Sequence, residues 1–175
     1  MARRRDFLRL SLVTLFVAGC AKEPEATKAL RALGVTYRLP KGWTHEDAED
    51  KGAVFILSPE VGGGVAATAM IEMPKEQNPR QIARLLRDQS EDLSQRHPDY
   101  KEVRLDPHVK LGPNFLGVLE YTATKKQVPL SEQYMLMQFG KDRTLLVFTS
   151  IATDVKSEYL PTLQEFLNSI RVAAP

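Results

Sequence analysis

The feature that most constrains the fold is a run of residues that is apolar on both faces of a strand. Residues 145–148 read Leu-Leu-Val-Phe, and they follow a polar turn at 140–143. Before the turn, residues 131–139 alternate between apolar and polar side chains, which predicts a half-buried strand and a hairpin. Successive side chains of a strand point to opposite faces, so the doubly apolar run needs cover on both. We therefore expect residues 144–149 to form a central strand.

Other segments predict further strands and two main helices. Alternating or continuous apolar patterns predict strands at 34–39, 53–58, 65–73, 100–111 and 115–124, of which 100–111 is either one strand or two short ones broken at Asp106-Pro107. A helix is expected to begin at Asn78-Pro79 and to end at His97-Pro98, because Asn is a favourable N-cap and Pro suits the first helical position. A second helix is expected after Asp154 as N-cap, with Pro161 either kinking it or marking its start.

The intervening segments have simpler interpretations. Residues 45–52 are predicted to be a charged loop, and 125–129 a basic connection. The single tryptophan, Trp43, is expected to anchor the core beneath the turn at 40–42, with ligand stacking as the alternative. Residues 22–31 are polar and contain Pro24, so we expect a flexible tether, with a short helical turn at 28–33.

This order of elements is typical of the α+β class. Hairpins dominate, so the sheet should be mostly antiparallel, and a central strand covered on both sides favours helices on both faces. We predict an α/β/α sandwich. A hydrophobic content of 43% within 175 residues is sufficient for one domain with its own core.

The N-terminal residues predict export and anchoring. A basic head precedes an apolar stretch at 10–18, which is too short to span a bilayer and is typical of a signal peptide. Residues 17–20, Val-Ala-Gly-Cys, resemble a bacterial lipobox. The resemblance implies cleavage before Cys20 and attachment of diacylglycerol to its thiol, with fatty acids such as palmitate as the membrane anchor. An ordinary secretory peptide with a chance cysteine is the alternative.

A second export motif overlaps the first. Arg4, Arg5, Phe7 and Leu8 match the twin-arginine pattern R-R-x-F-L-K, with Arg9 in place of Lys. The resemblance implies export of a folded protein, and the general secretion route is the alternative. An Asp directly after the lipidated cysteine would retain a lipoprotein in the inner membrane, and its absence here favours the outer membrane. The protein would then face the periplasm.

These signals divide the chain into three parts. Residues 1–19 would be a cleaved signal peptide, 20–33 a lipidated tether and 34–172 one domain. The signal peptide carries a net charge of +3, so the mature chain would fall from +2 to about −1. A nucleic-acid partner is therefore not expected.

Residues 37–43 and 169–170 resemble a known family. Tyr-Arg-Leu-Pro-Lys-Gly-Trp is similar to the strand and turn that open the PsbP-like fold, and Ser-Ile resembles the end of its last helix. This group includes an extrinsic protein of photosystem II and the DcrB-type bacterial lipoproteins. The resemblance, over about 34–171, implies a binding or accessory module at a membrane, and it provides no active site to transfer.

Chemistry-bearing residues are scattered along the chain. His45, His97 and His108 lack the spacing of a metal site, so we expect no metal and no cofactor. The glycines at 62–64 lack the Lys and Ser or Thr of a phosphate-binding loop and are read as a turn. Glu120 is the least expected carboxylate, because it lies in an apolar strand.

The sequence thus predicts no catalytic site. We expect a lipid-anchored, non-catalytic binding or accessory module of the bacterial envelope, with a protein partner there. The alternative is a periplasmic carrier of a small ligand, or an enzyme, with its pocket around Glu120 or His108. The partner or ligand, the oligomeric state and the export route stay open.

Overall fold

The structure, a computed structural model, describes residues 23–48, 53–61, 64–72, 82–111, 114–139 and 143–173. The predicted site residues Arg4, Arg5, Phe7, Leu8 and Cys20 lie outside these ranges. The elements, in chain order, are α1 (Glu25–Ala32), β1 (Val35–Thr36), β2 (Thr44–Asp47), β3 (Ala53–Leu57), β4 (Glu60–Val61), β5 (Gly64–Val65), β6 (Ala67–Glu72), α2 (Ile82–Arg96), β7 (Lys101–Leu111), β8 (Asn114–Lys125), β9 (Val128–Phe139), β10 (Arg143–Ala152), a 3-10 turn (Thr153–Val155), α3 (Lys156–Ser169) and β11 (Arg171–Val172).

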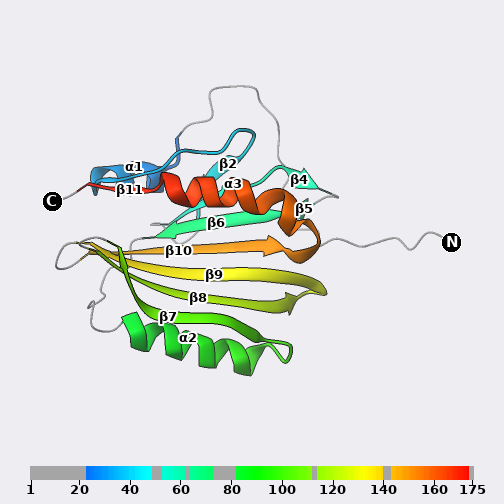
Figure 1. Cartoon of the computed structure of the whole chain (residues 1–175). Helices are drawn as coiled ribbons and strands as arrows, with labels where there is room; N and C mark the ends of the chain where they lie inside the picture. Colours follow the sequence, from blue (N-terminus) through cyan, green and yellow to red (C-terminus); the bar gives the residue numbers. More distant parts are fainter. Residues whose placement is uncertain are drawn as a thin grey trace.

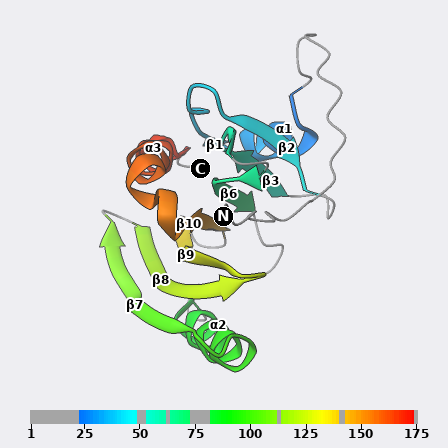
Figure 2. The ribbon, with the colours of Figure 1, turned by 90° about the vertical axis from the view of Figure 1, so that its right-hand side faces the viewer.

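Seven strands form one antiparallel sheet in the order β2-β3-β6-β10-β9-β8-β7, and it curves across the molecule (Figures 1 and 2). The α+β class and the antiparallel sheet are confirmed. β10 is the fourth of the seven strands, as its doubly apolar run predicts. Leu145 and Val147 are 0% and 2% exposed, and Leu146 and Phe148 on the other face are half-buried.

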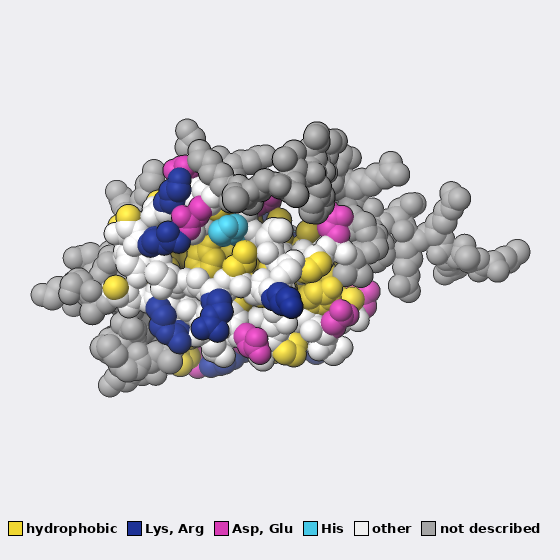
Figure 3. All heavy atoms as spheres, turned by 90° about the horizontal axis from the view of Figure 1, so that it is seen from above, with side chains coloured by type: hydrophobic (Ala, Val, Ile, Leu, Met, Phe, Trp, Pro, Cys, Tyr) yellow, Lys and Arg dark blue, Asp and Glu magenta, His cyan; other side chains and the backbone are white. Residues whose placement is uncertain are grey.

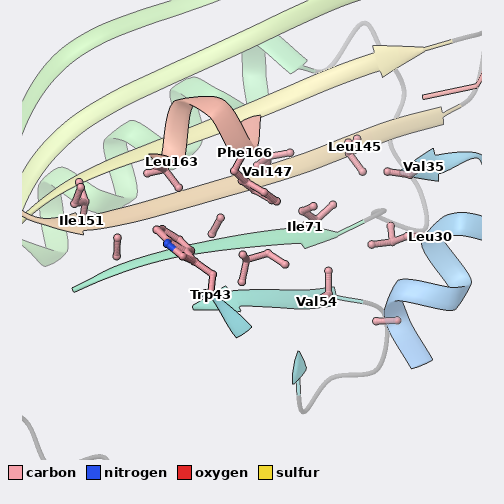
Figure 4. Close-up of a cluster of buried hydrophobic side chains, with 14 residues drawn as sticks. Leu30, Val35, Trp43, Val54, Ile71, Leu145, Val147, Ile151, Leu163 and Phe166 are labelled. Carbon is pink, nitrogen blue, oxygen red and sulfur yellow. The ribbon is translucent and has the colours of Figure 1, made fainter. Parts of the chain in front are cut away.

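The larger hydrophobic cluster lies beneath α3 and beside α1 (Figure 4). Leu163 and Phe166 of α3 point onto β10, and Leu30 of α1 lies near Val35. Trp43, 6% exposed, belongs to this cluster and contacts the Tyr159 ring, which confirms its role as a core anchor. The apolar side chains of α1, α3 and the first strands therefore share one core.

The second cluster lies beneath α2. Ile82, Leu86 and Leu93 of the helix pack with apolar residues of β8 and β9: Leu119, Tyr121, Ala123 and Leu136. Gly117 lies under the helix, where a Cβ atom would come within 2.5 Å of Ile82. Each helix covers part of the sheet, since α2 packs on β7 and β8 and α3 on β6 and β10. The full sandwich, with helices over both faces, stays a prediction.

The segment predicted to be flexible at 22–31 differs from the structure, because Glu25 begins helix α1. Asp47 of β2 holds its first turn, accepting hydrogen bonds from the backbone N–H of Glu25 at 2.9 Å and of Ala26 at 2.7 Å. Leu30 is buried on its inner face. A tertiary cap and a tertiary core contact thus stabilise a helix that includes most of the turn expected at 28–33 and begins three residues earlier.

Several boundaries also differ from expectation. Thr44–Asp47 form β2, an edge strand paired with β3, where a loop was predicted, and 49–52 lie outside the described residues. The first strand was predicted at 34–39, but within it only Val35–Thr36 form strand hydrogen bonds, and their partner is β11. The predicted connection 125–129 is a two-residue turn, in which Lys126 and Gln127 have φ of 49° and 69°.

The prediction for the last helix was wrong at its start. Asp154 lies in the 3-10 turn, and α3 begins at Lys156 with Val155 as N-cap and no side-chain capping bond. Pro161 lies inside the helix and does not mark its start. The other helix ends at Arg96 as predicted, whereas its expected cap at Asn78 lies outside the described residues.

Candidate functional site

A hollow among the described residues lies between α1, the segment after β1, and β2. It has a volume of about 170 Å³ and is lined by Glu23, Thr27, Arg31, Val35, Thr36, Tyr37, Leu39 and His45. Figure 3 looks onto this side of the molecule, where hydrophobic side chains gather near a histidine and are flanked by charged ones. The volume corresponds to about five or six water molecules, so only a small group fits.

A chain of three side chains crosses the floor of this pocket. The Tyr37 hydroxyl lies 2.8 Å from the Thr27 hydroxyl and 3.1 Å from Nδ1 of His45. Burial raises the pKa of Tyr37, so its hydroxyl keeps its proton at neutral pH. When Nδ1 of His45 is unprotonated it accepts from Tyr37, and Nε2 is then the N–H donor of the ring.

Charged groups lie on and beside α1, and two of them, Arg31 and Glu23, line the pocket. The Arg31 guanidinium pairs with the Glu23 carboxylate, and Lys28 pairs with Glu25 at 2.9 Å. Asp47 lies nearby, where hydrogen bonds from the backbone N–H groups of Ala26 and Glu25 hold its pKa below the ordinary value. The pocket can therefore exchange hydrogen bonds with a small polar ligand, next to one acid and one base.

Glu120 and His108, either of which was expected to centre the alternative pocket, each have local partners in the structure. Glu120 is half-buried on β8 and accepts a hydrogen bond from Gln133 Nε2 at 2.7 Å. His108 is exposed, and its backbone N–H contacts Asp106 at 3.3 Å. His97 follows α2, and its backbone N–H bonds to Leu93. The only one of the three histidines in the pocket is His45.

Sequence reasoning missed a buried carboxylate on the β8–β9 hairpin. Glu132 is 3% exposed, and the Lys125 ammonium lies 3.0 Å from its Oε1 and 2.7 Å from its Oε2. Burial, with Glu132 next to it, strongly raises the pKa of Tyr121. The Tyr121 ring stacks at 6.1 Å on Tyr134. The pairing register, which places Glu132 opposite Tyr121, was the missing information.

The described residues hold neither a metal-ligating cluster nor a helix suited to span a membrane. They contain no group of three or more His, Cys, Asp or Glu side chains placed to hold a metal ion. Within the same residues, no helix has the length and apolar character needed to cross a bilayer.

Three solved structures resemble this one. Cyanobacterial PsbP (CyanoP) of Synechocystis matches with a TM-score of 0.57 at 12% identity, over 81% of this chain and 88% of its own. LpqN of Mycobacterium tuberculosis, which is involved in cell envelope biogenesis, matches with a TM-score of 0.55 at 12% identity, over 81% and 83%. The fold is PsbP-like.

A third structure supports the same conclusion. A protein of unknown function from Pseudomonas aeruginosa matches with a TM-score of 0.55 at 12% identity, over 76% of this chain and 98% of its own. No protein-family model matches the sequence, and no curated protein is similar to it at a significant level. Identity this low shows the fold alone, so function must be argued from this chain's own residues.

Proposed function

We propose that this protein is a lipid-anchored envelope protein that acts as a non-catalytic binding or accessory module at a membrane surface, as in DcrB-type lipoproteins. Its precursor would be exported through the twin-arginine signal at Arg4, Arg5, Phe7 and Leu8, and Cys20 would carry the lipid. The placement of LpqN in cell envelope biogenesis agrees with this location.

The observation that supports this proposal most is the position of α1. The helix begins at Glu25, five residues after Cys20, and it is fixed to the domain by Asp47 and by the buried Leu30. A chain extends by at most about 3.6 Å for each residue. A lipid on Cys20 would thus hold the whole domain next to the bilayer, as an accessory module requires.

The proposed module is an α/β/α sandwich in which α2 and α3 cover opposite faces. Alternate residues of a strand point to opposite faces. Even-numbered Leu136 of β9 packs with α2, whereas odd-numbered Met135 packs with the cluster that contains α3. Two layers of helices would leave the ends of the sheet and the α1 side free for a partner.

The experiment compares the wild-type precursor with Cys20→Ala in a bacterial host. Intact mass of the purified N-terminal peptide should show a diacylated Cys20 in the wild type, and membrane fractionation should move the variant into the periplasmic fraction. An unmodified Cys20, or membrane association that survives the substitution, would refute the anchor. Arg4→Lys with Arg5→Lys tests the export route, because it blocks the twin-arginine pathway and leaves a basic head.

The partner is tested by crosslinking in intact membranes. A protein enriched with the wild type and lost with Cys20→Ala supports an anchored accessory module. Absence of any enriched protein in both would contradict the protein-partner part and would leave the anchor standing.

The pocket favours a second candidate function, a carrier of a small polar ligand. His45, Tyr37 and Thr27 form a connected donor and acceptor set beside Arg31. A Tyr37→Phe variant removes the central hydroxyl and preserves the ring contact with Phe166. Ligand screening by nuclear magnetic resonance, read at His45, would identify a carrier by shifts that occur in the wild type and disappear in Tyr37→Phe.

A further inference from the structure

Exposed basic side chains cover the face formed by α1, β1, β11 and the turn after β1. They are Lys28, Arg31, Arg38, Lys41 and Arg171. Thr36 of β1 pairs with Arg171 of β11, and the backbone N–H of Arg38 donates to Ser169 at the end of α3, so these segments form one continuous layer. Figure 3 views this layer and shows Lys and Arg side chains on both sides of the apolar hollow, with Asp and Glu side chains also present around it.

The acidic side chains along α1 already have cationic or backbone partners. Glu23 pairs with Arg31, and Glu25 with Lys28. In contrast, Arg38 and Lys41 form no ion pair within the residues that the structure describes. The Arg171 guanidinium donates to backbone carbonyl oxygens of its own segment and leaves its charge uncompensated. Asp47, which is likewise bonded only to backbone groups, adds one negative charge beside α1, so the three cations leave this face with an excess of positive charge.

The same face lies close to the proposed anchor. Glu23, which lines the pocket on this face, is the third residue after Cys20, so an extended chain reaches at most about 11 Å between them. The polar interfacial layer on one side of a bilayer is about 5 to 8 Å thick. A lipid on Cys20 would keep this face within the reach of lipid headgroups.

We propose that this basic face rests on an anionic bilayer, with Arg38, Lys41 and Arg171 contacting the headgroup phosphates. The inference builds on the proposed lipid anchor for its geometry. Each Lys or Arg near an anionic surface contributes about 1 kcal/mol, or about a fivefold gain in partition. Because the mature chain is near −1 overall, a locally positive face also turns the domain toward one orientation.

The test attaches the domain chemically, so that it does not depend on lipidation in the cell. Cys20 is the only cysteine, and the mature chain from residue 20 can be coupled to a maleimide lipid in nanodiscs. The nanodiscs contain about two parts of phosphatidylcholine to one part of phosphatidylglycerol, with a trace of gadolinium-labelled lipid. Relaxation enhancement then reports which amide groups lie near the surface.

We expect amides of 36–41 and 171–173 to be attenuated more strongly than those of α2. The triple variant Arg38→Gln, Lys41→Gln and Arg171→Gln should lose this difference. The matched triple Arg84→Gln, Arg87→Gln and Arg96→Gln removes the same charge from exposed positions of α2 and should keep it. For the chain without a tether, partition into phosphatidylglycerol vesicles should fall on the order of 100-fold in the first variant.

Other outcomes refute the inference. Equal attenuation of both sides, the same pattern in pure phosphatidylcholine discs, or loss of orientation in the α2 triple would each do so. Chemical shifts of each variant away from the substituted positions show whether it is folded. The anchor itself is judged by the mass of the cellular protein, so a failure of the basic face is distinguishable from a failure of lipidation.

Discussion

Lys125→Met should destabilise the domain, because Lys125 is the counter-ion of the buried Glu132. At 4 Å and an effective dielectric of about 20, two unit charges attract by about 4 kcal/mol, and removing one partner of a buried pair costs about 3–5 kcal/mol. The side chain of Lys125 keeps 35% of its exposure, so part of its charge is already screened. We therefore expect a loss of about 2–3 kcal/mol in the free energy of unfolding.

The converse substitution should cost less. Glu132→Leu leaves Lys125 unpaired, but the Lys125 ammonium can still be hydrated because its side chain is partly exposed. In Lys125→Met, by contrast, the unpaired Glu132 carboxylate stays buried away from water. We expect a cost of about 1 kcal/mol or less for Glu132→Leu, and the double variant should be more stable than Lys125→Met alone. The two substitutions each remove one charge of the pair, so their different costs follow from the different exposure of Lys125 and Glu132.

Urea unfolding of the mature chain measures these values. Trp43 is the only tryptophan and is buried, so its fluorescence should report the loss of the core, with far-ultraviolet circular dichroism as the second signal. Arg84→Met is the matched control, because it breaks the exposed pair with Asp88 and should cost less than about 0.5 kcal/mol. Additive costs in the double variant, or a cost below about 1 kcal/mol for Lys125→Met, would refute the reasoning.

Three further predictions concern local features. Folding lowers the pKa of Asp47, so its capping contribution is present above its unfolded pKa near 4 and is lost as the pH falls through the folded value. Between about pH 5 and 2, the free energy of unfolding measured in urea should therefore decline less in Asp47→Ala than in the wild type. Gly117→Ala forces a Cβ against Leu86 at 2.7 Å and should lower stability by about 1–3 kcal/mol, seen as an earlier thermal transition, while an unchanged transition would show that α2 moves aside freely. Replacing Lys126-Gln127 by Asn-Gly suits the positive φ of both turn residues and should raise the free energy of unfolding by about 1 kcal/mol, seen as a higher denaturant midpoint. No gain would contradict a left-handed turn there.

Period-two patterns predicted the central strands well, because each strand's apolar face is visible in its own sequence. β8, β9 and β10 match their expected ranges within a few residues, and the apolar run of β10 placed it in the middle of the sheet. Boundaries set by distant contacts were not predicted. The four residues of β2 read as a charged loop, since their pairing with β3 depends on register and not on hydrophobicity.

The pocket was less predictable than the strands. His45 and Tyr37 are eight residues apart and Thr27 precedes both, so no short motif joins them. The carboxylate singled out from the sequence, Glu120, is only half-buried and accepts a hydrogen bond from the Gln133 amide. The carboxylate that is fully buried is Glu132. Both carboxylates lie in strands with apolar neighbours, and only the face that each occupies distinguishes them.

Helix α1 joins the anchor, the pocket and the basic face through separate side chains. Leu30 packs in the core, Thr27 and Arg31 line the pocket, and Lys28 and Arg31 lie on the basic face. Because Asp47 fixes the first turn of this helix to β2, a flexible tether would be restricted to the few residues after Cys20. Loss of that cap should therefore loosen the orientation of the domain on a membrane before it affects the sheet, since most strand pairings lie away from α1.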